Sequence, residues 1–145
     1  STGALIDIHD NALTKNSWSG FVALNSIVAT VSNNTVDQTQ LVTNIVNGSS
    51  VDEGDGFCVF DGAQITLDGN TATANGRAGV FIDSAAAGTL VTNNTVNGND
   101  RAIIFQNDAN NLAADATGNQ VDGSIESYAN APYGVTKDSL AGVSP

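Results

Sequence analysis

The side chains nearest the start of the chain that could carry chemistry are one imidazole and two carboxylates. His9 is the single histidine of the sequence, Asp10 follows it directly, and Asp7 precedes it by two residues. An imidazole beside carboxylates can serve as the acid and base of a proton-transfer reaction. The same segment also matches an ordinary corner of a repeat, of the kind found at residues 97–99. The sequence allows both interpretations.

Two arginines are notable because the chain holds 4 basic residues against 15 acidic ones. Arg77 and Arg101 each precede an apolar run that is typical of a strand, so we expect them near one another on one edge of the stack. They could bind the carboxylate of an acidic sugar. The alternative is a surface ion pair with neighbours such as Asp100.

An acidic segment supplies candidate metal ligands. Asp52, Glu53 and Asp55 place three carboxylates within residues 52–55. Carboxylate oxygens, helped by backbone carbonyls, are the ligands that Ca²⁺ takes. Their spacing fits no known calcium loop, so a solvated acidic turn is the alternative. We expect that no cofactor is required and that Ca²⁺ is the one candidate ion.

The single tryptophan is a candidate sugar-binding residue. Trp18 lies in a polar corner, residues 13–19, that is longer than the equivalent corners later in the chain. An exposed indole could stack on a sugar ring, or it could belong to a flap that covers the edge of the fold.

A repeat must position these groups. Its marker is an asparagine with an apolar residue three positions before it and another two positions after it, and the spacings between successive markers are 36, 24 and 25 residues. The markers are Asn34, Asn70, Asn94 and Asn119. A period in the twenties with short strands and no helical pattern predicts a β-solenoid.

Stacked coils would put equivalent residues directly above one another at roughly 4.8 Å. Asparagines at one inward corner can then pair their amides from coil to coil. We therefore predict an all-β parallel β-helix of about five coils with a structural ladder of these asparagines.

The apolar runs after the glycines predict two outward rows on one sheet. Alternation along the strands sends Val59, Phe81 and Ile104 outward, so we expect another segment or a partner chain to cover them as an interface. The next outward row contains Asp61 and Asp83, which are candidate ligand-binding residues.

We interpret residues 1–145 as a single β-helix domain. The coils are predicted over 4–125, with an insertion at 37–55 and an irregular capping tail at 123–145. Nothing in the sequence predicts a cap over the first coil, whose strand edges would be open. We expect a polysaccharide or another protein chain there.

Composition limits the partners. The net charge is −11, which disfavours nucleic acid and anionic membranes because both bind clustered Lys and Arg. No run approaches the ~20 apolar residues of a membrane helix, so we expect no membrane insertion. The single cysteine, Cys58, lies in an apolar run and is predicted to be a buried small hydrophobe.

The sequence resembles the right-handed parallel β-helix repeat family, which includes pectate lyases, polygalacturonases, alginate epimerases and many bacterial surface proteins. The resemblance covers residues 4 to about 125 and rests on Gly-Val-Phe-Ile-Asp at 79–83, Thr-Asn-Asn-Thr-Val-Asn-Gly-Asn at 92–99 and Ile-His-Asp-Asn at 8–11. The chain is most similar to the C-terminal coils of mannuronan C5-epimerases and polysaccharide lyases. These repeats indicate a fold more than an activity.

The resemblance to epimerases implies a catalytic role for Asp7, His9 and Asp10, as acid, base and neutraliser of a uronate carboxylate. Three departures count against it: Ile8 replaces the proline of the family motif, no tyrosine lies within 100 residues, and residues 8–11 match an ordinary repeat corner better. We predict a secreted or cell-surface module that binds carbohydrate or has a structural role. The alternatives are the C-terminal part of an epimerase or lyase, and a self-assembling structural subunit.

Overall fold

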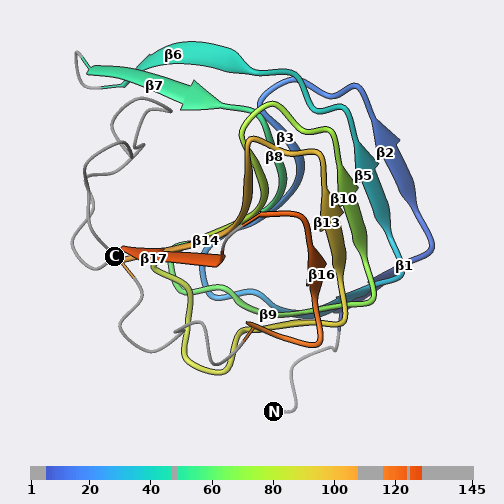
Figure 1. The fold of residues 1–145 in the computed structure, drawn as a ribbon. Coiled ribbons are helices and arrows are strands. Elements are labelled where there is room, and N and C mark those ends of the chain that lie inside the picture. The colour runs from blue at the N-terminus through green and yellow to red at the C-terminus, as the bar shows by residue number, and fades with distance from the viewer. Residues whose placement is uncertain (1–5, 47–48, 108–115, 124, 129–145) are drawn as a thin grey trace.

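The computed structural model describes residues 6–46, 49–107, 116–123 and 125–128. Within them the chain winds through successive coils, and each coil adds one strand to each of three 5-stranded parallel sheets (Figure 1). This confirms the predicted solenoid of about five coils. No helix long and apolar enough to cross a membrane occurs in the described part of the chain.

Each of the three sheets takes one strand from every coil. The first consists of β1 (Ile6–His9), β4 (Val28–Ser32), β9 (Gln64–Asp68), β12 (Leu90–Thr92) and β15 (Ala116–Thr117). The second consists of β2 (Ala12–Thr14), β5 (Thr35–Asp37), β10 (Thr71–Thr73), β13 (Thr95–Asn97) and β16 (Gln120–Val121). The third consists of β3 (Ser19–Ala23), β8 (Asp55–Phe60), β11 (Ala78–Asp83), β14 (Arg101–Gln106) and β17 (Ile125–Tyr128).

Three apolar rows run through the interior from the first coil to the fifth, because every second side chain of a strand points inward and parallel pairing stacks equivalent positions. The row of the first sheet is Ile8, Val31, Leu67, Val91 and Ala116. The rows of the second and third sheets are Leu13, Val36, Ala72, Val96, Val121 and Phe21, Phe57, Val80, Ile103, Ile125. The middle members of all three rows are at most 1% exposed, so they form one continuous core.

The predicted asparagine ladder runs along the corner between the first and second sheets. Asn70 donates from its backbone N–H and from Nδ2 to Oδ1 of Asn94, at 2.8 and 3.0 Å. Asn34 and Asn94 make the same pair of bonds to the next asparagine up the stack. Asn11 adds a member that the sequence analysis did not predict, because it also donates to Asn34.

A second amide row follows the corner between the second and third sheets. Asn75 donates from N and Nδ2 to Oδ1 of Asn99, each at 2.9 Å. A Cβ at Gly56 would lie 2.4 Å from the carbonyl oxygen of Gly79, and a Cβ at Gly79 would lie 2.2 Å from Cγ1 of Val96, with Nδ2 of Asn75 and of Asn99 next at 2.9 and 2.8 Å. Glycine is therefore required at the second position of each of these two strands by the close approach of neighbouring atoms.

The insertion contains an antiparallel hairpin. Strands β6 (Val42–Val46) and β7 (Ser49–Glu53) pair with one another and project from the body of the solenoid (Figure 1). Ile45 is 72% exposed on this hairpin, whereas Val51 is buried.

The outward row of the third sheet differs from the prediction at Val59. The register aligns Val59 with Ile82 and Ala23, so Val59 points into the core and is fully buried. The outward neighbour of Phe81 is instead Cys58, which is buried as predicted, and Ile104 follows in the same row. Phe81 and Ile104 are 3% and 1% exposed, so these side chains form no exposed interface.

Asp61 is also placed differently from the prediction. The register pairs Asp83 with Phe60, and Asp61 is an exposed corner residue with φ 50°. Gln106 and Tyr128 continue the row of Asp83. Tyr128 ends β17, a regular strand within the stretch predicted as an irregular tail, and residues 129–145 lie outside the described residues.

Candidate functional site

The outer face of the first sheet carries an unbroken row of polar side chains, which we call the polar row. It takes one residue from each coil, because parallel pairing puts equivalent positions side by side. Its members are His9, Ser32, Asp68, Thr92 and Thr117. A row of this kind presents hydrogen-bonding groups at the ~4.8 Å spacing of the coils.

Asp68 is the anionic centre of the polar row. The Oγ1 hydroxyl of Thr92 and Nδ2 of Asn93 donate to its Oδ1, at 2.7 and 2.8 Å. These two hydrogen bonds, that of Thr92 first, lower the pKa of Asp68 below its ordinary value of 3.8. The carboxylate is therefore ionised and fixed in orientation at neutral pH.

The corner beside the polar row keeps Asn93 in reach of Asp68. Asn93 adopts a left-handed backbone with φ 55°, as Asn33 does with φ 54° in the second coil. Asparagine tolerates this conformation better than most residues. Each of these corners turns the chain from the first sheet toward the ladder asparagine that follows.

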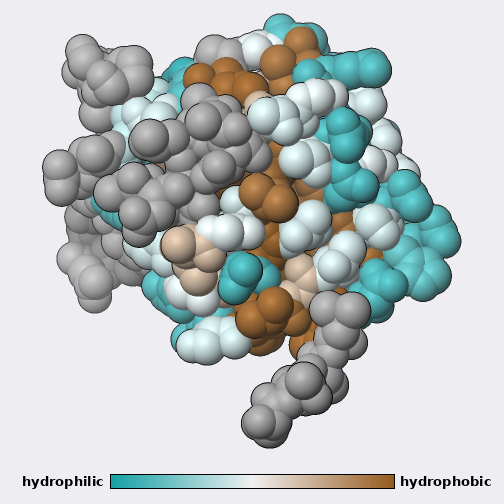
Figure 2. Space-filling view, turned by 90° about the horizontal axis from the view of Figure 1, so that it is seen from below, coloured by the Kyte–Doolittle hydropathy of each residue, from teal (hydrophilic) through white to brown (hydrophobic). Residues whose placement is uncertain are grey.

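An apolar band lies beside the polar groups on the same face. Val28 and Leu90 point outward from the first sheet and are 53% and 39% exposed, and Ile27 next to Val28 is 41% exposed. Figure 2 shows this face, with hydrophobic groups in a broken band along its middle and hydrophilic groups along one side. The face thus combines apolar contact area with ordered polar groups.

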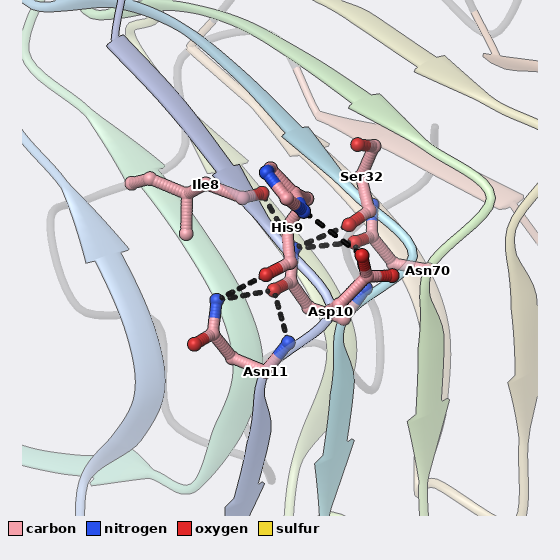
Figure 3. Close-up of polar contacts among 7 residues, drawn as sticks. Ile8, His9, Asp10, Asn11, Ser32 and Asn70 are labelled. Carbon is pink, nitrogen blue, oxygen red and sulfur yellow. Dashed lines mark hydrogen bonds and ion pairs between the residues drawn. The ribbon is translucent and has the colours of Figure 1, made fainter.

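His9 and Asp10 lie at the end of this face in the first coil. Nδ1 of His9 is 2.9 Å from Oδ2 of Asp10, and both side chains are exposed, at 57% and 70% (Figure 3). The hydrogen bond to Asp10 raises the pKa of His9 above 6.5, helped by the negative charges of Asp10 and Asp7. Because both His9 and Asp7 point outward from β1, the imidazole and carboxylates predicted from the sequence share one surface.

The register shows which corner this segment forms. The backbone N–H of Asp10 donates to the carbonyl of Ser32, as that of Asn33 donates to Asp68 one coil further on. The segment is therefore equivalent to residues 32–34, whereas the sequence analysis aligned it with 97–99. Asn11 takes the ladder position and donates to the backbone carbonyl of His9 (Figure 3).

Arg77 forms a buried ion pair on the third sheet. Its Nε and Nη2 donate to the two carboxylate oxygens of Asp55, at 2.8 and 2.5 Å, and both side chains are less than 5% exposed. Asp55 also accepts from the N–H of Ala78, and the guanidinium lies 4.4 Å from the ring centre of Phe81. The carboxylate of Asp55 is therefore paired with Arg77 and does not join Asp52 in a metal site.

The other two acidic residues of this segment lie on the hairpin. Asp52 accepts a hydrogen bond of 2.5 Å from Thr43, and Glu53 accepts one from Asn44. These are pairs across the two strands of the hairpin. Among the described residues, no three side chains of His, Cys, Asp or Glu are grouped to hold a metal ion.

Arg101 and Arg77 are neighbours through the backbone, as the sequence predicted, because the N–H of Arg101 donates to the carbonyl of Arg77. Their side chains have different partners. Arg101 pairs with Glu126 at 3.2 Å and lies 3.8 Å from Asp100. Glu126 also accepts from the hydroxyl of Tyr128, and burial together with this bond raises the pKa of Tyr128 to about 12.

Two further predicted ligand-binding residues lie apart from the polar row. Trp18 is 40% exposed near the start of β3 and has φ 76°, an uncommon conformation for a bulky residue. Asp83 is buried on the third sheet, where it accepts from Gln106 and Asn107, each at 3.1 Å. The residues of the polar row beyond His9 were not predicted from the sequence. Their signal was Ser, Asp or Thr two positions before Asn34, Asn70, Asn94 and Asn119.

The thiol of Cys58 is buried beside the ion pair. Burial and the charge of Asp55 hold its pKa well above the ordinary value, and Ser19 donates to its sulfur at 3.2 Å. A neutral buried thiol is a poor nucleophile. Cys58 therefore contributes packing.

The comparisons with known proteins agree with this architecture. Residues 1–131 match the family model described as the right handed beta helix region. No curated protein and no solved structure matches the chain. A match of this extent, together with the coils described above, places the chain in the right-handed β-helix family.

Proposed function

We propose that this domain binds an extended, uncharged polysaccharide along the outer face of its first sheet. The observation that carries the proposal is the polar row beside an apolar band, with Asp68 held ionised and oriented by Thr92 and Asn93. Such a role implies a secreted or cell-surface protein, and the fold is one found in carbohydrate-active proteins.

The chemistry of this face fits sugars in two ways. A sugar ring offers hydroxyl groups around its rim and C–H groups on its faces. The carboxylate of Asp68 can accept from ring hydroxyls through strong, charge-assisted hydrogen bonds. Val28 and Leu90 can lie against the C–H faces, where burial of apolar area favours binding.

The negative charge of this face favours an uncharged polymer over a polymer of uronates. The first sheet presents Asp7 and Asp68 on its outer face, with His9 as the one group there that can become cationic. Within the described ranges, the lysine and arginine side chains belong to the other two sheets or their corners, at Lys15, Arg77 and Arg101. A uronate carboxylate on this face would therefore meet like charge.

Binding measured on matched variants tests the proposal. Asp68→Asn keeps the shape of the side chain but removes its charge. The control is Asp37→Asn, because Asp37 accepts from Thr73 at 3.0 Å in an equivalent pair on the second sheet. Affinity electrophoresis against a neutral β-glucan, a neutral mannan and alginate gives the relative affinities.

We expect a neutral polymer to bind, Asp68→Asn to weaken it about tenfold or more, and Asp37→Asn to leave it unchanged. A tenfold loss corresponds to about 1.4 kcal/mol, which is the scale of one charged hydrogen bond. Equal losses in both variants, or a preference for alginate, would contradict the proposal.

A second candidate function is the epimerase or lyase chemistry that the family resemblance implies. It is favoured by the shared surface of His9, Asp7 and Asp10 and by the raised pKa of His9. Proton NMR of alginate after incubation reports epimerisation, and ultraviolet absorbance of a new double bond reports lyase activity. Activity that is lost in His9→Ala would favour this candidate over simple binding.

A further inference from the structure

Among the described residues, no further coil covers the interior rows of the solenoid at either end. The six apolar residues that are only partly buried against the core are the first and last members of the three rows. At the first coil they are Ile8, Leu13 and Phe21, and at the fifth they are Ala116, Val121 and Ile125. Each row therefore ends in an apolar side chain that a further coil would cover.

The amide ladder has a direction, and its two ends are complementary. Each asparagine donates from N and Nδ2 to Oδ1 of the next one up the stack. Among the described residues, Oδ1 of Asn11 receives no hydrogen bond, and the backbone N–H of Asn119 has no acceptor. In Figure 3 the side-chain oxygen of Asn11 points away from the other labelled residues. The last coil thus offers a donor where the first offers an acceptor.

The strand edges are complementary in the same way. The pairing partners of β1, β2 and β3 within the described residues all lie on the side of the second coil. Likewise, β15, β16 and β17 pair only with the fourth coil. Unpaired strand edges are templates for pairing with another chain.

The net charge of −11 makes copies repel one another, but the rows that would meet at the contact add no repulsion of their own. If the rows continued from the fifth coil of one copy to the first coil of another, Thr117 would meet His9. Asp122 would meet Thr14, and Glu126 would meet Val22. No pair of like charges is brought together in these rows.

We propose that copies of this domain stack head to tail, with the fifth coil of one docked on the first coil of the next. The stack continues the three apolar rows and passes the hydrogen bonds of Asn119 to Asn11 of the neighbouring copy. This contact joins two different surfaces and does not close, so it produces chains of copies. The inference does not depend on the polysaccharide proposal.

Two variants test the stack, each with a charge that blocks one end of the solenoid. Leu13→Glu places a carboxylate in the open end of the first coil, and Val121→Glu does so at the fifth. Sedimentation velocity over a concentration series should show chains for the unchanged protein and monomers for each variant alone. An equimolar mixture of the two variants should form dimers and nothing larger, because only one competent contact remains. Circular dichroism establishes that both variants are folded.

A second test changes only charges at the contact and leaves the apolar core unchanged. Thr14→Lys faces Asp37 within its own copy and Asp122 across the contact, so it should assemble as well as the unchanged protein or better. Asp122→Lys alone should also assemble. The double variant, with both Thr14→Lys and Asp122→Lys, would bring two lysines together across the contact. It should self-associate at least tenfold more weakly than the unchanged protein, and high salt should restore assembly.

The proposal is overturned if the unchanged protein stays monomeric at every concentration, as it would if another segment covered the fifth coil. It is also overturned if Leu13→Glu alone still assembles, since the contact would then not use the first coil. Leu90→Glu on the side of the solenoid is the control. Assembly lost in that variant would indicate side-to-side contact.

Discussion

Asn16 and Thr39 lie one coil apart in the second amide row, and each has a buried polar atom without a partner among the described residues. The atoms are Nδ2 of Asn16 and Oγ1 of Thr39. Thr39 takes the position that Asn75 and Asn99 occupy in later coils, and its N–H donates to Asn75 as an asparagine there would. The hydroxyl of Thr39 is too short to accept from the amide below.

Thr39→Asn should therefore stabilise the protein. Its Oδ1 can accept from Asn16, and its Nδ2 can donate to Asn75. With about 1 kcal/mol for each added hydrogen bond, we expect the melting temperature to rise by several degrees. Thermal unfolding followed by circular dichroism measures the shift. Thr39→Val is the control and should change stability little, because the hydroxyl that it removes has no partner. A loss of stability in Thr39→Asn would mean that the corner near Gly20 lacks room for the amide.

Removing an amide should cost more in the middle of the ladder than at its end. Asn70 is 2% exposed, accepts from Asn34, and donates to the carbonyl of Val31 and to Asn94. Asn70→Ala leaves several buried groups unpaired, at about 1–3 kcal/mol for each. Asn11→Ala, at the exposed end, should cost about 1 kcal/mol or less. Urea unfolding of the two variants gives both values, and equal losses would contradict a cooperative ladder.

The ladder and the coils were predictable because both depend on register. An asparagine that pairs with its own equivalent must recur at each coil, and the apolar residues around Asn34, Asn70, Asn94 and Asn119 recur with it. This recurrence predicted the stacked coils and the ladder without any knowledge of individual contacts.

The direction of Val59 was not predictable by alternation, because β8 is apolar on both faces from Phe57 to Phe60. Period-two alternation fixes a strand only when one face is polar. The glycines carried the missing signal. Val59 is three residues after Gly56, whereas Phe81 is two residues after Gly79, so the two side chains point in opposite directions.

The polar row was not predicted from the sequence for a related reason. Threonine, serine and aspartate are ordinary outward residues of a half-exposed strand. Nothing in the spacing of Asp68 distinguishes it until the register places Thr92 and Asn93 against its carboxylate. Side-chain partners one coil away are set by the fold, so they appear only once the coils are aligned.

Arg77 should be more important for stability than Arg101. Arg77→Met leaves the buried carboxylate of Asp55 without its counter-charge, which typically costs about 3–5 kcal/mol. Arg101 is 26% exposed, so Arg101→Met should cost about 1 kcal/mol or less. Combining Arg77→Met with Asp55→Asn should recover much of the loss, because the amide still accepts from Ala78 without a charge. Urea unfolding measures all three, and a double variant no more stable than Arg77→Met would argue that packing matters more than charge.

The state of Asp68 should depend on Thr92. The pKa of Asp68 lies below 3.8 in the folded protein, so its contribution to stability is present above that value and is lost as the pH falls through the folded pKa. Thr92→Val removes the largest cause of the shift, and we expect the pKa of Asp68 to rise toward 3.8. Carbon-detected NMR titration of the carboxyl resonances measures the change, with Asp37 as the internal reference. If the polar row binds a polysaccharide through an ionised Asp68, affinity should also fall in the same pH range in which this carboxyl becomes protonated. Affinity that does not change through that titration would separate the geometry of the row from its proposed role.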